Sequence, residues 1–322
     1  MRRASMMVRR GLPPLALLAG TTLAVTGIAA PARAGAQVTS RACAPATLAV
    51  SFGTSGLDAS HVNAFLVFTN TASVACTLSG YPTVHYVTKS GTPIGNPSQP
   101  AAVAHGPVTL GKGQSAHSLL RSSVPGVWPA AQCMATQDYG IQVLAPGSTH
   151  AKMLHFPESV CAGLAIHEST TAPVSPGRGP VPSACRAAQL TDTLGQSQGA
   201  LGTIYVPVVF TNTTVDTCTL RGHPKVTSVH GATHAQVGPA AASDPGTART
   251  IWVQPFGGTA SAALGVVETG NFPASACVPK SASGVRVTPP HTGHATVLAY
   301  PHTVCTHLAS THVSAVVAGS LG

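Results

Sequence analysis

The stretch "FTNTASVACTLSGYPTV" at residues 68–84 returns at residues 210–226 as "FTNTTVDTCTLRGHPKV". In both copies an apolar run ends at an asparagine between threonines, Asn70 or Asn212, and a cysteine follows six residues later. An asparagine side chain can bond its own backbone two residues on and close a turn. We interpret the repeated stretch as a structural element that ends a strand and forms a turn in each copy of a duplicated fold. Ligand binding by the Thr-Asn-Thr tip is the alternative.

The cysteines extend this duplication over most of the chain. Their separations are 33, 57 and 28 positions in the first half and 33, 59 and 28 in the second. Such agreement indicates two homologous repeats, which we place at residues 41–168 and 185–313. Between them, residues 169–184 are rich in proline and are expected to be a linker that leaves the repeats independently folded. Residues 314–322 are expected to be a C-terminal tail.

Alternating apolar residues predict the fold class. Residues 62–68 place apolar side chains on one face of an extended strand, and residues 204–210 repeat the pattern. Further strands are expected at residues 48–52, 83–87, 115–120, 140–144 and 152–156, and no stretch keeps a helical period. We therefore predict an all-β chain with two tandem immunoglobulin-like antiparallel β-sandwich domains. Phe65 aligns with Pro207, and since proline cannot donate to a ladder, this position predicts a bulge or an unpaired edge.

The order of these motifs resembles a known family. An early cysteine, an apolar strand ending in "TNT", a "CTLxGxP" stretch and two late cysteines are similar to the domain-of-unknown-function 4232 family of secreted actinobacterial proteins. The resemblance covers both repeats and implies export and a β-sandwich, and it supplies no catalytic residues. The second repeat departs from the first by having His223 in place of Tyr81.

The N-terminus predicts export. Residues 1–34 show an arginine-bearing start, an apolar run and the small-residue ending Ala32-Arg33-Ala34, which together indicate a signal peptide cleaved before Gly35. An uncleaved anchor is the alternative, but Pro13 and Pro14 would make a poor spanning helix. General secretion is favoured over twin-arginine export. We expect a secreted protein, extracellular or loosely cell-wall-associated, with no membrane span in the mature chain.

Composition argues against nucleic acid as a partner. Charged residues are 8% and aromatic residues 4% of the chain, whereas nucleic-acid binders cluster Lys and Arg beside aromatic side chains. Five of the 17 basic residues lie within the first 34 positions, which leaves 12 against 8 acidic residues.

Catalytic motifs are not found in the sequence. No acidic residue occupies equivalent places in both repeats, and no nucleophile elbow or phosphate-binding glycine loop is present. We expect no enzymatic activity, no catalytic residue and no cofactor. A cell-envelope hydrolase with an unrecognised site is an alternative, and it would need either a carboxylate pair or a Ser or Thr beside a His.

Histidine is the one abundant reactive residue type, with 15 copies. Imidazole is a common metal ligand, so His291 and His294 are the candidates for an extracellular metal-handling site, which is a second alternative. Solvated polar positions remain the main interpretation, because only His150 and His294 align between the repeats. Of the two tryptophans, Trp252 is expected to pack in a strand and Trp128 in a loop.

The cysteine pairing follows from hairpin geometry. Cys133 and Cys161 each lie 14 positions from Gly147, and Cys277 and Cys305 each lie 14 from His291, so each pair should meet across a hairpin. The same argument, that two cysteines at equal distances from a turn lie opposite each other, pairs the first two cysteines of each repeat. The expected disulfides are Cys43–Cys76, Cys133–Cys161, Cys185–Cys218 and Cys277–Cys305.

The sequence thus favours a secreted, disulfide-stabilised, non-enzymatic binding or structural module of the cell envelope. Its expected partner is an envelope protein or glycan.

Overall fold

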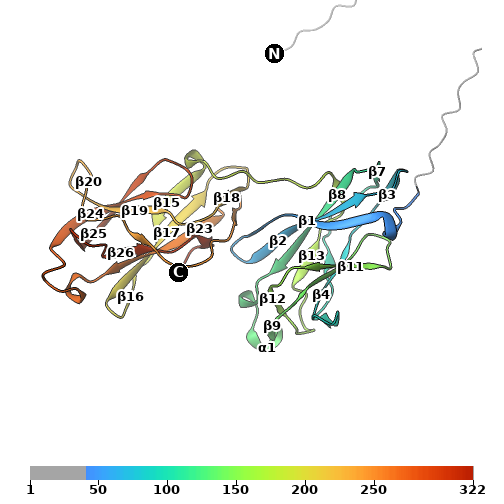
Figure 1. Cartoon of the computed structure of the whole chain (residues 1–322), viewed down its shortest axis with the longest axis horizontal. Coiled ribbons are helices and arrows are strands. Elements are labelled where there is room, and N and C mark those ends of the chain that lie inside the picture. The colour runs from blue at the N-terminus through green and yellow to red at the C-terminus, as the bar shows by residue number, and fades with distance from the viewer. Residues whose placement is uncertain (1–40, 322) are drawn as a thin grey trace, which may run out of the picture. The chain divides into compact units, whose positions relative to one another are not determined.

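A computed structural model describes residues 41–321, so the expected signal peptide at residues 1–34 lies outside the described residues. Both repeats are all-β, and they belong to one unit, Ser40–Gly322 (Figure 1). Within the described part of the chain, no helix combines the length and apolarity needed to cross a membrane. The helical structure of residues 41–321 consists of α1 (Ala130–Cys133) and four single-turn 3₁₀ helices, namely η1 (Pro45–Thr47), η2 (Pro125–Val127), η3 (Ala187–Gln189) and η4 (Thr269–Asn271).

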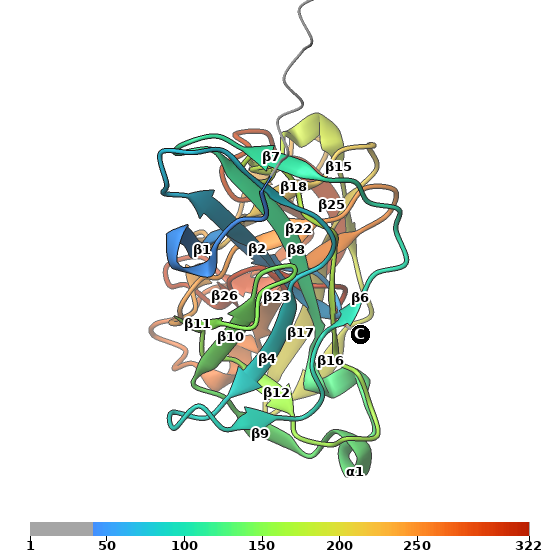
Figure 2. The ribbon, with the colours of Figure 1, turned by 90° about the vertical axis from the view of Figure 1, so that its right-hand side faces the viewer.

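The first repeat is a sandwich of two sheets whose strands are mainly antiparallel. Its larger sheet has the order β1 (Leu48–Leu57), β2 (His61–Asn70), β8 (Ser115–Ser123), β13 (Ser169–Thr171) and β6 (Gln99–Pro100), with β14 (Ser175–Pro176) also on β8 (Figures 1 and 2). The facing sheet has the order β11 (Ala151–His155), β10 (Gly140–Leu144), β4 (Thr83–Val87) and β5 (Pro93–Ile94). Two short ribbons join β3 (Cys76–Leu78) to β7 (Val108–Leu110) and β9 (Ala135–Gln137) to β12 (Ser159–Cys161).

The second repeat copies this topology. Its larger sheet has the order β15 (Leu190–Leu194), β17 (Thr203–Asn212), β23 (Thr259–Val267), β26 (Thr311–Val313) and β21 (Ala242–Ser243), with β16 (Gln198–Ala200) on β17 and β27 (Val317–Ala318) on β23. The facing sheet has the order β20 (Ala235–Gln236), β19 (Lys225–His230), β24 (Pro279–Thr288) and β25 (Thr296–Cys305). β18 (Cys218–Leu220) pairs with β22 (Ile251–Val253), as β3 pairs with β7. The predicted fold class, two tandem immunoglobulin-like sandwiches, is confirmed.

Two expected boundaries are wrong. Residues 169–176, assigned to the linker, supply β13 and β14 and pair with β8 of the first repeat. Residues 317–318, assigned to the tail, form β27 and pair with β23. Short strands that contain or adjoin proline carry too little alternation to stand out from a linker, and their pairing partners are distant in sequence. The connection between the sandwiches is therefore residues 177–184.

The alternating runs form the cores of the sandwiches. Leu66 and Phe68 on β2 are fully buried, and Val208 and Phe210 on β17 hold the matching places in the second repeat. Burying such a side chain stabilises the fold by roughly 1.5–3 kcal/mol. These apolar side chains hold the two sheets of each repeat together.

The position shared by Phe65 and Pro207 is a bulge in both repeats, as predicted. The β1–β2 register shifts between Phe52 and Ser55, opposite Phe65. In the second repeat the pairing with β17 is interrupted opposite Pro207, where β15 has ended and β16 has not yet begun. The Gly195 N–H donates to the Pro207 carbonyl there. Proline is tolerated because its missing donor faces the interrupted side of the ladder.

The repeated asparagines close buried turns. The Asn70 amide donates to the carbonyls of Leu110 and Val74 and accepts the Ala72 N–H. Asn212 makes the same bonds to Val253, Asp216 and Thr214. Both side chains are fully buried, and each ties a strand end to a neighbouring β-strand. This geometry confirms the interpretation of the repeated stretch as structural.

All eight cysteines are paired, and the four predicted disulfides are confirmed. The β10–β11 hairpin pairs Gly140 with His155 and Leu144 with Ala151, which places Cys133 and Cys161 opposite each other just beyond it. Trp128 is half-buried and packs on this disulfide together with Ile166, as expected for a packing role in a loop.

The two repeats also contact each other. Leu57 of β1 pairs in parallel with Ile251 of β22, and the Arg249 guanidinium lies 2.7 Å from the Glu158 carboxylate. Trp252, in a strand as expected, is buried with its ring centroid 5.8 Å from that of Phe65. The connecting segment therefore does not keep the two sandwiches apart, although their independent folding stays a prediction.

Candidate binding cleft

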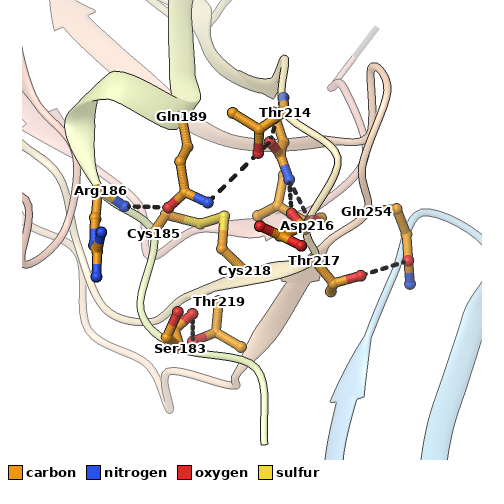
Figure 3. The surroundings of a disulfide bond; sticks show 12 residues. Ser183, Cys185, Arg186, Gln189, Thr214, Asp216, Thr217, Cys218, Thr219 and Gln254 are labelled. Atoms are coloured by element: carbon orange, nitrogen blue, oxygen red, sulfur yellow. Dashed lines mark hydrogen bonds between the residues drawn. A yellow bond between two sulfur atoms is a disulfide. The ribbon is translucent and has the colours of Figure 1, made fainter. Parts of the chain in front are cut away.

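The connecting segment is held against the second repeat at the Cys185–Cys218 disulfide. The Thr219 N–H donates to the Ser183 carbonyl at 2.8 Å, and the Cys185 N–H donates to the Thr219 carbonyl at 2.9 Å (Figure 3). The connecting segment is thus fixed to β18 by two backbone hydrogen bonds and one disulfide. The cleft described next opens beside this attachment.

Amide and hydroxyl side chains surround the attachment. The side-chain oxygen of Gln189 accepts the backbone N–H of Arg186 at 2.8 Å, and the side-chain NH₂ of Gln189 donates to the Thr214 hydroxyl at 3.5 Å (Figure 3). The Thr217 hydroxyl donates to the Gln254 side-chain oxygen at 3.3 Å. These residues come from η3, from the loop between β17 and β18 and from the residue after β22. Two turns and a strand end therefore present a fixed set of polar groups.

These groups line a cleft of about 900 Å³. The connecting segment borders it through Pro180, Val181 and Pro182, and the apolar part of its lining comes from Phe65, Leu119 and Trp252. Its polar lining comes from both repeats and includes Asn63, Arg121, Gln189, Thr214, Thr217 and Gln254. Ligand sites in proteins are concave, with a few well-placed polar groups on a largely apolar wall, and this cleft has both features.

One buried carboxylate organises the polar lining. Asp58 Oδ2 accepts hydrogen bonds from Asn63 at 3.0 Å, from Arg121 at 3.3 Å and from Gln254 at 3.3 Å. All three donors line the cleft, whereas Asp58 itself is only 6% exposed. Asp58 Oδ1 accepts the backbone N–H groups of Ser60 and His61. Asp58 is therefore a positioning residue behind the cleft.

The charge of Asp58 is maintained by its contacts. Burial alone would raise the pKa of this carboxyl, but the hydrogen bonds from Asn63 and the Ser60 N–H and the charge of Arg121 outweigh it and lower the pKa. The carboxylate is therefore ionised at neutral pH and holds three donors in place. The equivalent of Asp58 in the second repeat is Ala200, so this arrangement belongs to the first repeat alone.

An exposed aromatic side chain adjoins the cleft. The loop between β22 and β23 spans residues 254–258, one residue longer than the loop 111–114 of the first repeat. Phe256 in this loop is 78% exposed and has a positive φ of 55°, an uncommon conformation for a bulky residue. Its N–H donates to the carbonyl of Thr214, which lines the cleft. Val215, 67% exposed, lies in the same loop as Thr214.

The metal candidates are not brought to this cleft. His291 and His294 are exposed in the turn between β24 and β25. Among residues 41–321, no three His, Cys, Asp or Glu side chains are grouped as metal ligands. Asp192 is the acidic neighbour of His294, and burial raises its pKa despite that histidine.

Both kinds of group required for a hydrolase do occur, at buried positions. Asp138 and Glu168 are carboxyls in one region of the first repeat, and the Ser228 hydroxyl lies 2.8 Å from His302 Nε2 in the second. Burial lowers the pKa of His302, and Ser228 is 3% exposed. Neither group lines the cleft. His302 is half-buried and lines a separate, smaller pocket, which Ser228 does not line.

The cleft could not be predicted by comparing the two repeats, because its residues are not shared between them. Asp58, Asn63 and Arg121 lie up to 63 positions apart, and each has a different residue type at its counterpart. The signal that could have identified them is an aspartate at the end of an apolar strand, beside a histidine and an asparagine in "DASHVN" (residues 58–63).

The comparisons with known proteins address the family and leave activity open. A search of the curated proteins found no match to the chain. A family described as a domain of unknown function matches twice, over residues 43–176 and 185–318. These limits agree with the strands, since the matches include β13 and β14 in the first repeat and β26 and β27 in the second. The chain therefore belongs to the DUF4232 family, of which it contains two tandem copies.

Proposed function

We propose that the protein is an exported, non-enzymatic module of the cell envelope that binds its ligand in the cleft beside Cys185–Cys218. Four disulfides support export, because disulfides persist in oxidising compartments and are rare in the cytosol. The arginine-bearing, apolar N-terminus supports a cleaved signal peptide.

The observation that carries the binding function is the convergence of three cleft donors on Asp58. Asn63, Arg121 and Gln254 are held by one buried carboxylate. Asn63 is itself buried, but the accessible atoms of Arg121 and Gln254 do not need to be ordered when a ligand arrives. Fixing such side chains in advance removes part of the entropy cost of binding. A purely structural role would not require amides and a guanidinium to line an open cleft.

The lining fits a glycan of the envelope better than a protein. Amide, hydroxyl and guanidinium groups are hydrogen-bonding partners for a hydroxyl-rich polymer, and Phe256 offers a flat apolar face beside them. The two aromatic residues that line the cleft, Phe65 and Trp252, are themselves buried. Protein interfaces, by contrast, centre on exposed aromatic anchors, whereas the exposed aromatic residue here, Phe256, lies beside the cleft and does not line it.

A capture experiment tests this proposal. The mature protein, immobilised and incubated with envelope extract, is expected to retain a glycan fraction and to leave its chain length unchanged. The double variant Arg186→Ala/Gln254→Ala should lose most of this retention, because both side chains line the cleft. Gln236→Ala, an exposed glutamine on β20 that bonds only Gly238, is the matched control and should retain the glycan.

Three results would contradict the proposal. Equal retention by wild type and by the double variant would place binding elsewhere, and shortened glycan chains would indicate hydrolysis. Retention of a single protein in place of a glycan would support binding but replace the ligand class.

A further inference from the structure

Two buried carboxyl groups lie at one end of the first repeat, and neither of them lines the cleft. Asp138 follows β9 and is 5% exposed, and Glu168 precedes β13 and is 7% exposed. Asp138 accepts the Glu158 N–H at 2.6 Å, and Glu168 accepts the Cys161 N–H at 2.9 Å. Both carboxyls therefore hold the same short segment, residues 158–161, which includes β12 and one half of a disulfide.

The surroundings of the pair supply little positive charge. Tyr86 on β4 is buried and hydrogen-bonded to the Ser122 hydroxyl of β8. The Glu158 carboxylate beside Asp138 is paired with Arg249, and the imidazole near Asp138 is that of His155 on β11, which opposes the rise in the pKa of Asp138. Among residues 41–321, Asp138 Oδ2 has no hydrogen-bond partner although it is buried. An ionised pair here would place two negative charges in a poorly solvated region.

This environment favours the neutral acids. Burial raises the pKa of Asp138 to about 6, and the nearby Glu158 charge adds to the increase. Burial raises the pKa of Glu168 to about 7, and the charge of Asp138 adds to it. Burial also raises the pKa of Tyr86, which therefore stays neutral.

The second repeat builds the same end of the sandwich without these acids. Ala282 stands at the place of Asp138, and Ser310 stands at the place of Glu168. The Ser310 hydroxyl accepts the Cys305 N–H at 2.9 Å, which is the bond that Glu168 makes to Cys161. His302 replaces Glu158 and bonds Ser228, which replaces Tyr86. At the place shared by Glu168 and Ser310, the fold therefore needs a hydrogen-bond acceptor for the cysteine N–H. This acceptor does not have to be ionisable.

We propose that Asp138 and Glu168 make the hold on residues 158–161 dependent on protons, so that this end of the first repeat is firm in acid and loosens as both carboxyls ionise. This property goes beyond the proposed binding function and does not depend on it. In the unfolded chain the two groups have ordinary pKa values of 3.8 and 4.5. The folded repeat therefore binds more protons than the unfolded chain between about pH 4 and about pH 7, and its stability falls as pH rises through that window.

Hydrogen exchange of the whole mature chain tests the proposal. Amides of residues 133–161 are compared with those of residues 277–305, which serve as the internal control, at about pH 5 and about pH 8 after correction for intrinsic exchange rates. Protection of the first segment is expected to fall by about tenfold or more, since each pKa unit of difference is a factor of ten. The control segment should not fall, because burial lowers the pKa of His302 and the stability linked to that group rises with pH. An equal response of the two segments would overturn the proposal.

Matched variants identify the groups responsible. The double variant Asp138→Ala/Glu168→Ser installs the residues of the second repeat and should remove the pH response, and Asp138→Asn/Glu168→Gln should do the same while keeping hydrogen-bond acceptors. Asp216→Ala, an exposed aspartate of the second repeat, should leave the response intact. Persistence of the response in both double variants would contradict the assignment. If the double variants do not fold, infrared titration of the wild type decides, because the proposal requires protonated carboxyl bands that disappear between about pH 5 and about pH 8.

Discussion

At the residue scale, single polar side chains do most to fix the loops of each sandwich. The fully buried side chains of Asn70 and Asn212 each donate to two carbonyls and accept one N–H, and Asn212 also accepts the Thr214 hydroxyl. This role was predictable from the sequence because the asparagines recur with their flanking threonines. The role of Asp58 was not predictable, because its partners are separated in sequence and have no counterparts in the second repeat.

Replacing either asparagine should destabilise its own repeat. Asn70→Ala or Asn212→Ala leaves a buried carbonyl and a turn N–H without partners, and we expect a loss of about 1–3 kcal/mol in each case. Chemical denaturation of the mature chain measures this loss. Asn271→Ala removes one exposed bond to Gly202 and should change stability by less than about 0.5 kcal/mol. A loss no larger than that of the control would show that the turns close without the amide.

At the scale of elements, strands with a buried alternating face could be predicted and short pairing strands could not. The expected strands at residues 83–87 and 140–144 coincide with β4 and β10, because hydrophobic alternation reports burial directly. The sequence predicts a linker where β13 and β14 lie, because "STTAPVSP" has two prolines and little alternation of apolar and polar residues. Their stability comes from pairing with β8, a contact that depends on tertiary structure.

The disulfides act at the same scale, since each closes a loop around one ribbon or hairpin. The separations of 33 and 28 residues predict a contribution of about 3–4 kcal/mol for each bond through restriction of the unfolded chain. The variant Cys185→Ser/Cys218→Ser should lose this amount and also release residues 177–184 from β18. Thermal unfolding measures the first effect, and limited proteolysis of the connecting segment measures the second. Unchanged proteolysis would show that the backbone bonds to Thr219 suffice.

At the scale of the whole molecule, the repeats have the same fold but different surfaces. The first supplies Asn63 and Arg121 to the cleft, with Asp58 behind them, whereas the second supplies Gln254 to the cleft and the longer loop with Phe256 beside it. The cysteine spacing made the duplication evident, but the sequence could not show that the repeats meet, because contacts such as Arg249 with Glu158 join single-copy residues.

The revised boundaries lead to a prediction about truncation. A chain of residues 41–178 retains β13 and β14 and is expected to fold under oxidising conditions, whereas a chain of residues 41–168 leaves the β8 edge and Leu119 unpaired and should not fold stably. Circular dichroism and the cooperativity of thermal unfolding distinguish the two. Equal stability of both chains would show that β13 and β14 are dispensable.

The buried turn at Asn212 has a consequence for production in eukaryotic hosts. Asn212-Thr213-Thr214 is an acceptor sequence for N-linked glycosylation, whereas the first repeat has Asn70-Thr71-Ala72 and is exempt. In the folded protein the Asn212 amide is fully buried and bonded to Val253 and Asp216, so an oligosaccharyltransferase could reach it only before folding. A sugar attached at that moment would occupy the amide that closes the turn. Yeast or mammalian secretion is therefore expected to yield a second repeat that is either unmodified and folded or glycosylated and retained by quality control.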